Sequence, residues 1–185
     1  MTISVGIDYS LTSPCMCVML APSFDGARFF YLTSEKRYEG VAFGNIRGDL
    51  HAKYSSEQER HDSISQYFVD RLVECNVDTD VHITLEDYSY GSKGKVFNLA
   101  ENCGLLKHKL WKAGYIIDTV APAALKKFAT GKGNAKKEHM YDAFLALGYP
   151  DINATLSPKK TVIGNPVSDI VDSFYLALLG AKNSK

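Results

Sequence analysis

Alternating apolar and polar residues predict five strands along this chain. Residues 3–8 (ISVGID) place Ile3, Val5 and Ile7 on one face and end at Asp8. Residues 15–20 and 28–33 show strand-like patterns and are joined by the Gly-containing turn SFDGA. Three strands with short connections predict an antiparallel meander. Two later segments, 81–86 (VHITLE) and 115–120 (YIIDTV), are the fourth and fifth strands.

Apolar residues spaced three and four apart predict helices in the rest of the chain. Ser56 and Glu59 form a capping-box pattern at the start of the first helix. Asn165 and Pro166 are suited to the N-cap and first position of the last helix, and Gly180 is expected to end it. The four helices are expected near residues 56–75, 95–113, 135–147 and 166–180.

The helix between the fourth and fifth strands makes a strand–helix–strand unit, so these two strands should be parallel. Residues 34–54 have a mixed pattern and are expected to be a loop, as is the lysine-rich stretch around Gly131 and Gly133. Neither an internal repeat nor a linker is visible. The pattern therefore predicts one domain spanning residues 1–185, with a mixed α/β sheet flanked by helices.

Composition is that of an ordinary globular protein, with 45% hydrophobic and 23% charged residues. Apolar runs all fall short of the roughly 20 residues that a membrane helix needs, and the N-terminus lacks the pattern of a secretory signal. The four cysteines lack the spacing of a zinc site, so we expect them to be reduced thiols in a cytoplasmic protein.

A net charge of zero conceals an uneven distribution of charge along the chain. Residues 1–87 carry 7 basic and 14 acidic side chains, whereas residues 88–140 carry 10 lysines and 3 acidic side chains. Such a basic segment, with aromatic residues among the lysines, suits a polyanion such as a nucleic acid. Solvated helix faces are an equally good interpretation of the charge alone.

Four carboxylates are placed where a sheet of this kind brings side chains together. Asp8 and Glu86 close the first and fourth strands, and sites in open sheets form at the carboxyl ends of strands. Asp169 and Asp172 share one face at the start of the last helix. Taken singly, each acid is more often a cap or a solvated turn residue. Together they are a donor set for Mg²⁺, and two such ions about 4 Å apart would suit phosphodiester hydrolysis.

Three motifs carrying these acids, GIDYS, LEDYS and SDIVDSFYLA, resemble the RNase H-like nuclease superfamily. The stretch APAALKKFATGKGNAKKEHM at 121–140 resembles the one before the last helix of RuvC-type Holliday junction resolvases. The resemblance runs in order from Asp8 to about Leu178. It implies an RNase H-like mixed five-stranded sheet, with three antiparallel strands followed by parallel ones.

The resemblance also implies an activity and its residues. It implies a homodimeric endonuclease that nicks paired strands of four-way DNA junctions, using two Mg²⁺ ions per site with Mn²⁺ as a substitute, and leaves 5′-phosphate and 3′-hydroxyl ends. The implied metal ligands are Asp8, Glu86, Asp169 and Asp172. Two catalytic lysines match Lys126 and Lys137, with Lys127 and Lys136 as adjacent alternatives.

This sequence departs from the bacterial pattern at two places. Tyr9 and Ser10 follow the first Asp where Pro-Gly is usual, and Ser89 stands where the family has an aromatic wedge. Tyr88 or Tyr90 could instead stack on unpaired bases, although packing at a strand end is nearly as good an explanation. These departures suggest a diverged, phage-encoded nuclease acting in the host cytoplasm. The lysines expected to contact DNA phosphates are Lys93, Lys95, Lys127, Lys132 and Lys136.

Two other functions fit parts of the sequence. GIDYSLTS also resembles the first phosphate loop of actin-like sugar kinases and ATPases, although a second phosphate loop is missing. A non-catalytic junction-binding protein would keep the fold, but the presence of all four carboxylates argues against it. Trp111, near the end of the second helix, is expected in the core or in a dimer interface.

Overall fold

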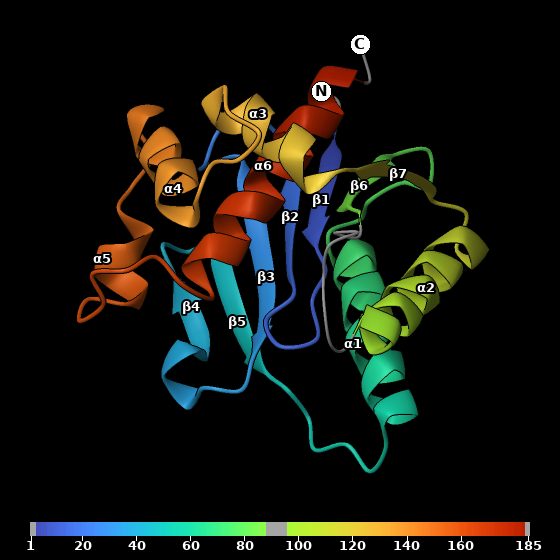
Figure 1. Ribbon diagram of the computed structural model, residues 1–185. Helices are drawn as coiled ribbons and strands as arrows, with labels where there is room; N and C mark the ends of the chain where they lie inside the picture. The colour runs from blue at the N-terminus through green and yellow to red at the C-terminus, as the bar shows by residue number, and fades with distance from the viewer. Residues whose placement is uncertain (1–2, 88–95, 184–185) are drawn as a thin grey trace.

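The structure is a computed structural model that describes residues 3–87 and 96–183. Its centre is a mixed seven-stranded sheet in the order β4-β5-β3-β2-β1-β6-β7 (Figure 1). The first three strands are β1 (Ser4–Asp8), β2 (Cys15–Met19) and β3 (Ala27–Thr33). β2 pairs antiparallel with both β1 and β3, which confirms the predicted meander.

The sheet is wider than the five strands expected from the sequence. Residues 34–54, expected to be a loop, contain the 3₁₀ turn η1 (Lys36–Tyr38) and a hairpin of β4 (Gly40–Ala42) and β5 (Ile46–Leu50). β5 pairs parallel with β3, so the hairpin of β4 and β5 extends the sheet by two strands beyond β3. The prediction was wrong because the buried positions of β5 carry only Ile46 and Gly48, which leaves almost no apolar alternation to detect.

The parallel half of the sheet places β6 (His82–Glu86) between β1 and β7 (Ile116–Val120). The connection between β6 and β7 carries α2 (Val96–Lys112), as predicted. Before β6 lies α1 (Glu57–Glu74), where the Ser56 side chain accepts a hydrogen bond from the Glu59 backbone N–H. The N-cap half of the predicted capping box is therefore confirmed, whereas the Glu59 carboxylate accepts from the Ser55 backbone N–H rather than from that of Ser56.

A further helix, α3 (Pro122–Thr130), replaces the first part of the stretch expected to be a lysine-rich loop. Leu125 is the one buried residue in it, so the amphipathic signal in the sequence is weak. The helix begins after Ala121 with Pro122 in its first turn and ends at Gly131 in the left-handed conformation. The predicted helix before Gly148 is α4 (Lys137–Ala146), and the short α5 (Ile152–Leu156) follows it.

The last helix, α6 (Val167–Asn183), packs directly on β1. A Cβ atom on Gly6 would lie 2.2 Å from the Ala177 backbone nitrogen, so only glycine permits this close approach. Gly180 does not end the helix, contrary to expectation. It lies inside α6, where an added Cβ would come within 2.4 Å of Thr84 Oγ1.

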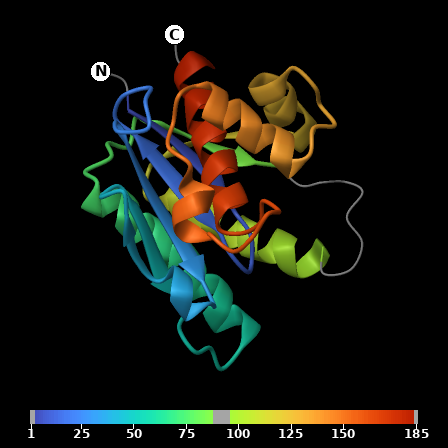
Figure 2. The same cartoon turned by 90° about the vertical axis from the view of Figure 1, so that its left-hand side faces the viewer.

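Helices cover both faces of the sheet, and each face has its own hydrophobic core. One core joins the sheet to α6, α3, α4 and α5, and the other joins it to α1 and α2. Figure 2 shows α6 and α4 on the opposite side of the strands from α1. The four cysteines all lie within the described residues, and no disulfide joins them.

Candidate active site

Asp8 and Glu86 lie side by side at the carboxyl ends of adjacent strands. β1 and β6 are parallel, and Ile7 pairs with Leu85 in their register, so the acids follow at the same level. Ile7 and Leu85 are fully buried, whereas both acids are partly accessible. The sheet therefore presents two carboxylates at one edge.

Asp169 and Asp172 reach the same place from α6. Asp169 lies in the first turn of the helix and is 6% exposed, and Asp172 is one turn further on. The contact of α6 with β1, which the glycine at position 6 makes close, holds this part of the helix over the strand end. Four acids from three elements thus meet at the carboxyl edge of the sheet.

The acids are close enough to alter one another's protonation. Burial raises the pKa of Asp8 well above its usual value, and the charges of Asp169, Asp172 and Glu86 raise it further. Burial, followed by the charges of Glu86 and Asp169, raises the pKa of Asp172 to about 7. Burial raises the pKa of Asp169 to about 6 and also raises that of Glu86. The cluster therefore resists full ionisation unless cations offset its charge.

Two lysines supply part of that positive charge. Lys137, at the start of α4, lowers the pKa of all four acids, and Lys126 in α3 lowers those of Glu86 and Asp172. Lys136 is instead the N-cap residue of α4, and Lys127 is exposed. Of each adjacent pair that the sequence left open, Lys137 and Lys126 are the members beside the carboxylates.

Hydroxyl and amide groups that the sequence did not indicate also reach the acids. Ser13, in the loop after β1, donates a hydrogen bond to Asp169 Oδ2, and Ser168 donates to Oδ1 at 3.2 Å. The side chain of Asn165, expected as a helix cap, bonds the Ser13, Lys137 and Ser168 side chains. No residue-type pattern distinguishes such serines and asparagines from those of ordinary loops, so only the fold identifies them.

Solved structures with a similar arrangement of helices and strands are known. RuvC from Thermus thermophilus matches with a TM-score of 0.60 and 16% identity, over 99% of this chain and 95% of that one. The T. thermophilus RuvC in complex with its Holliday junction substrate matches with a TM-score of 0.61 and 14% identity, over 100% and 95%.

This chain has the RuvC fold. The yeast mitochondrial Holliday junction resolvase Ydc2 also matches, with a TM-score of 0.51 and 13% identity, over 97% of this chain and 80% of Ydc2. No family model and no curated protein sequence matches the chain. The RNase H-like sheet expected from the sequence is therefore confirmed, with two strands more than predicted.

Tyr9 shows how this chain fills the position after the first acid of its RuvC fold. Its ring is 7% exposed and packs edge-on against Phe68 of α1, with centroids 5.7 Å apart. Its hydroxyl donates to Asn102 Oδ1 of α2 at 3.2 Å. The departure from Pro-Gly at this place thus anchors the end of β1 to both helices on that face.

The four carboxylates are the kind of ligand that binds a divalent cation. Four carboxylates supply the hard oxygen donors that Mg²⁺ and Mn²⁺ take, and their mutual repulsion favours a cation among them. Yet no three Asp, Glu, His or Cys side chains within residues 3–87 and 96–183 are arranged so that they could hold an ion. Each oxygen of Asp169 accepts one hydroxyl hydrogen bond, which leaves a second lone pair that can face an ion. Ion binding would therefore have to bring the other carboxylates closer to Asp169.

The residues expected to contact DNA fall in two groups. Lys127, Lys132 and Lys136 are exposed around the α3–α4 turn, on the same segment as Lys126 and Lys137. The others, Tyr88, Tyr90, Lys93 and Lys95, lie outside the described residues, as does Ser89.

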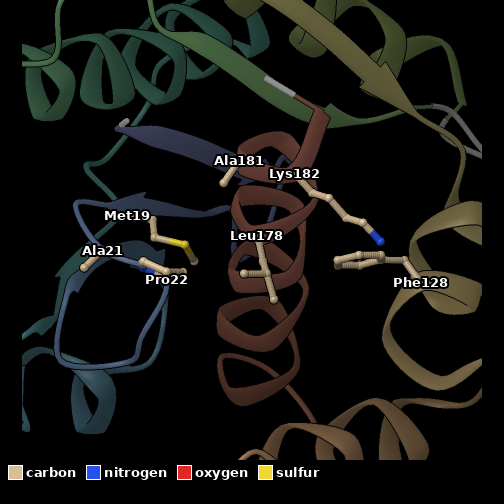
Figure 3. Close-up of a pocket in the computed structure, with 7 residues that line it drawn as sticks. All are labelled: Met19, Ala21, Pro22, Phe128, Leu178, Ala181 and Lys182. Carbon is tan, nitrogen blue, oxygen red and sulfur yellow. The ribbon is translucent and has the colours of Figure 1, made fainter. Parts of the chain in front are cut away.

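A hollow with a mainly apolar lining has a volume of about 520 Å³ (Figure 3). It is lined mainly by the end of β2, the turn after it, Phe128 of α3 and the last turns of α6. None of the four carboxylates lines it.

None of the helices in the described parts of the chain is long and apolar enough to span a bilayer.

Proposed function

We propose that this protein is a structure-selective endodeoxyribonuclease that resolves four-way DNA junctions and other branched DNA. The observation that carries the proposal is the meeting of Asp8, Glu86, Asp169 and Asp172 at one sheet edge of a RuvC fold. A match over nearly the whole chain to RuvC bound to a Holliday junction supports this substrate class. Hydrolysis would nick paired strands and leave 5′-phosphate and 3′-hydroxyl ends.

Asp8, Glu86, Asp169 and Asp172 would hold two Mg²⁺ ions, or Mn²⁺ in their place. Bound divalent ions lower the pKa of water and neutralise charge on a phosphodiester. The chain's own part is to place the acids on rigid elements and to bring Lys137 beside them. Lys137 would offset negative charge that develops on the scissile phosphate, and Lys126 would do so from the Glu86 side.

The basic segment would bind the DNA backbone around the carboxylates. Lys127 in α3, and Lys132 and Lys136 in the turn that follows it, are exposed and would contact phosphates. Lys93 and Lys95 would extend this surface, and Tyr88 or Tyr90 would stack on bases at the branch point. Binding of this kind depends little on sequence and weakens steeply with salt.

Nicking two strands of one junction calls for two sites, and α2 offers a surface for a homodimer. Five residues of this helix form an exposed stripe at helical spacing, with Phe97 82% and Trp111 68% exposed. Trp111 is therefore not in the core, which leaves the interface as its expected role. The stripe consists of Phe97, Glu101, Gly104, His108 and Trp111.

The stripe suits a two-fold contact centred on Gly104. A Cβ on Gly104 would meet nothing within 4 Å, so a second helix can approach closely there. Phe97 lies seven residues before Gly104, and Trp111 lies seven residues after it. In an antiparallel pair of α2 helices, Phe97 of one copy would therefore meet Trp111 of the second copy. In the same arrangement Glu101 would face Lys107 of the second copy, which has the opposite charge.

A cleavage assay tests the proposed function. Labelled four-way junction and linear duplex of the same sequence are incubated with the protein in Mg²⁺, in Mn²⁺ and in EDTA, and the cuts are mapped. We expect paired nicks in the junction only, dependent on the ion, and none with Asp8→Asn. Binding of the junction without cleavage would support the non-catalytic alternative, and ATP hydrolysis without DNA would support an actin-like enzyme. Either result contradicts the proposal.

A further inference from the structure

Side-chain hydrogen bonds link Lys137 to Asp169 through two polar residues. Lys137 Nζ donates to Asn165 Oδ1 at 3.1 Å. Asn165 Nδ2 in turn donates to Ser13 Oγ at 2.5 Å, and Ser13 donates to Asp169 Oδ2. Ser168 closes the ring, because its hydroxyl accepts from Lys137 at 3.0 Å and lies 3.2 Å from Asp169 Oδ1.

Chemistry fixes the direction of the three bonds that run from Lys137 through Asn165 and Ser13 to Asp169, whereas the single proton of Ser168 can go to Asn165 Oδ1, 3.0 Å away, or to Asp169 Oδ1. An ammonium group can only donate hydrogen bonds, and an ionised carboxylate can only accept them. The Asn165 amide must therefore turn its carbonyl to Lys137 and its NH₂ to Ser13. The single proton of Ser13 is then directed to Asp169. The bonds run one way from cation to anion, and such aligned chains polarise one another.

The ring joins the segments that build the carboxylate cluster. Ser13 comes from the loop after β1, Asn165 from the turn before α6, and Lys137 from the first turn of α4. Ser13 is 6% exposed and Ser168 is 3% exposed, so water does not readily replace their bonds. Asn165 and Lys137 are exposed, but loss of Ser13 would leave Oδ2 of the buried Asp169 without a donor, and loss of Asn165 would leave the buried Ser13 without one.

We propose that Ser13 and Asn165 are positioning residues that orient the Asp169 carboxylate and hold Lys137 beside it. This inference rests on the proposed function, in which Asp169 is a metal ligand. Groups that hydrogen-bond a ligating side chain set its orientation, and their removal commonly lowers metal affinity or activity by about 10- to 100-fold. Ser13 and Asn165 themselves need not touch the metal or the DNA.

The test measures Mn²⁺ binding to the full-length protein by calorimetry without DNA, and in parallel the single-turnover rate of junction cleavage. Ser13→Ala and Asn165→Asp are compared with Ser4→Ala. Ser4 is a matched control because it too is a buried serine that donates to α6, at the Ala177 carbonyl and 2.6 Å away. We expect the first two variants to weaken Mn²⁺ binding and slow cleavage by about 10- to 100-fold, and Ser4→Ala to change neither.

Asn165→Asp separates the two tasks of Asn165. An aspartate still accepts from Lys137, but it cannot donate to Ser13 and would draw the Ser13 proton away from Asp169. Retention of full Mn²⁺ affinity and rate in this variant would overturn the directed chain. Ser13→Thr keeps a hydroxyl and should recover most of what Ser13→Ala loses, whereas a Thr variant as impaired as the Ala variant would contradict the proposal.

The two readouts distinguish failure of this inference from failure of the proposed function. If the wild type cuts no junction but Ser13→Ala and Asn165→Asp still weaken Mn²⁺ binding, the proposed function is contradicted and the positioning role is supported. If all variants bind Mn²⁺ as the wild type does, or the wild type binds none, the positioning role is overturned. Should Ser13→Ala unfold, Asn165→Asp and Ser13→Thr decide by the same criteria.

Discussion

Asp8 directly follows Ile7, and Glu86 directly follows Leu85, the residue that pairs with Ile7 in the neighbouring parallel strand. The backbone pairing of β1 and β6 therefore sets the separation of the two carboxylates. Side-chain packing sets the rest, because α6 brings Asp169 and Asp172 to the same end of β1. Electrostatic repulsion among the four carboxylates therefore destabilises the folded protein when no cation is bound.

Asp8→Asn should abolish cleavage and also stabilise the protein in EDTA. The mutation removes a buried charge that three other acids oppose. We expect a higher Tm in EDTA than that of the wild type and a smaller rise in Tm on adding Mg²⁺. Thermal unfolding with and without the ion checks this, and a lower Tm in EDTA would contradict the repulsion.

Stability in EDTA should fall as the pH rises from about 4 to 7. The folded protein holds protons on Asp169, with a pKa of about 6, and on Asp172, with a pKa of about 7, where the unfolded chain has already lost them. Since the folded state binds more protons in this range, rising pH favours unfolding, by up to about 1.4 kcal/mol per pH unit for each group.

Tm measured from pH 4.5 to 8 tests this dependence. Saturating Mg²⁺ should flatten the slope above pH 6, because a bound cation favours the ionised carboxylates. The double variant Asp169→Asn, Asp172→Asn should show a flatter profile in EDTA. A wild-type Tm that rises through this range would contradict the assigned pKa directions.

Lys137→Ala and Lys136→Ala should affect different steps although the residues are neighbours. Lys137 acts on all four acids, so its loss should lower the single-turnover rate by about 100-fold at saturating DNA. Lys136, exposed at the N-cap of α4, should chiefly affect the Kd for the junction and reduce its salt dependence. Rates at saturating DNA and Kd values in Ca²⁺ separate the two. Equal effects on both steps would argue against the distinction.

Trp111→Glu should convert the proposed dimer to monomer. The substitution places a charge where the indole would meet Phe97 of a second copy, while the 68% exposure of Trp111 means that the fold itself does not need it. Light scattering after size exclusion measures the mass. Val73→Glu, at an exposed apolar residue on α1, is the control that should leave the dimer intact. A wild type that is monomeric at micromolar concentration would contradict the interface.

Gly6→Ala should destabilise the protein by about 1–3 kcal/mol. The added methyl would lie 2.3 Å from the Ser173 carbonyl oxygen, so α6 would have to move away from β1. Gly164→Ala, where a Cβ meets nothing within 4 Å, should change stability by less than about 0.5 kcal/mol. Urea unfolding of both variants checks the difference, and equal stabilities would show that α6 is not held against β1 as described.

The sequence was sufficient for elements with regular apolar spacing. The meander, the parallel pair β6 and β7, and helices α1, α2, α4 and α6 follow from such patterns. It failed where tertiary contacts replace that spacing. β5 buries a glycine at one inward position, α3 buries only Leu125, and Gly180 serves helix–sheet contact rather than termination.

The same division holds for the candidate site. The four acids could be singled out because strand ends and helix starts are recognisable positions, and the structure brings them together. The choice between Lys136 and Lys137 depends on which way the first turn of α4 faces, which spacing alone does not give. Ser13 and Asn165 depend on contacts between segments about 150 residues apart, which no local pattern encodes.

The placement of α2 and α6 on opposite sides of the sheet has a consequence for assembly. A dimer joined through α2 would be built back to back, with each sheet standing between the shared seam and its own cluster of acids. The two clusters would then lie on opposite, outward-turned faces of the dimer, where each could engage a separate arm of one branched molecule.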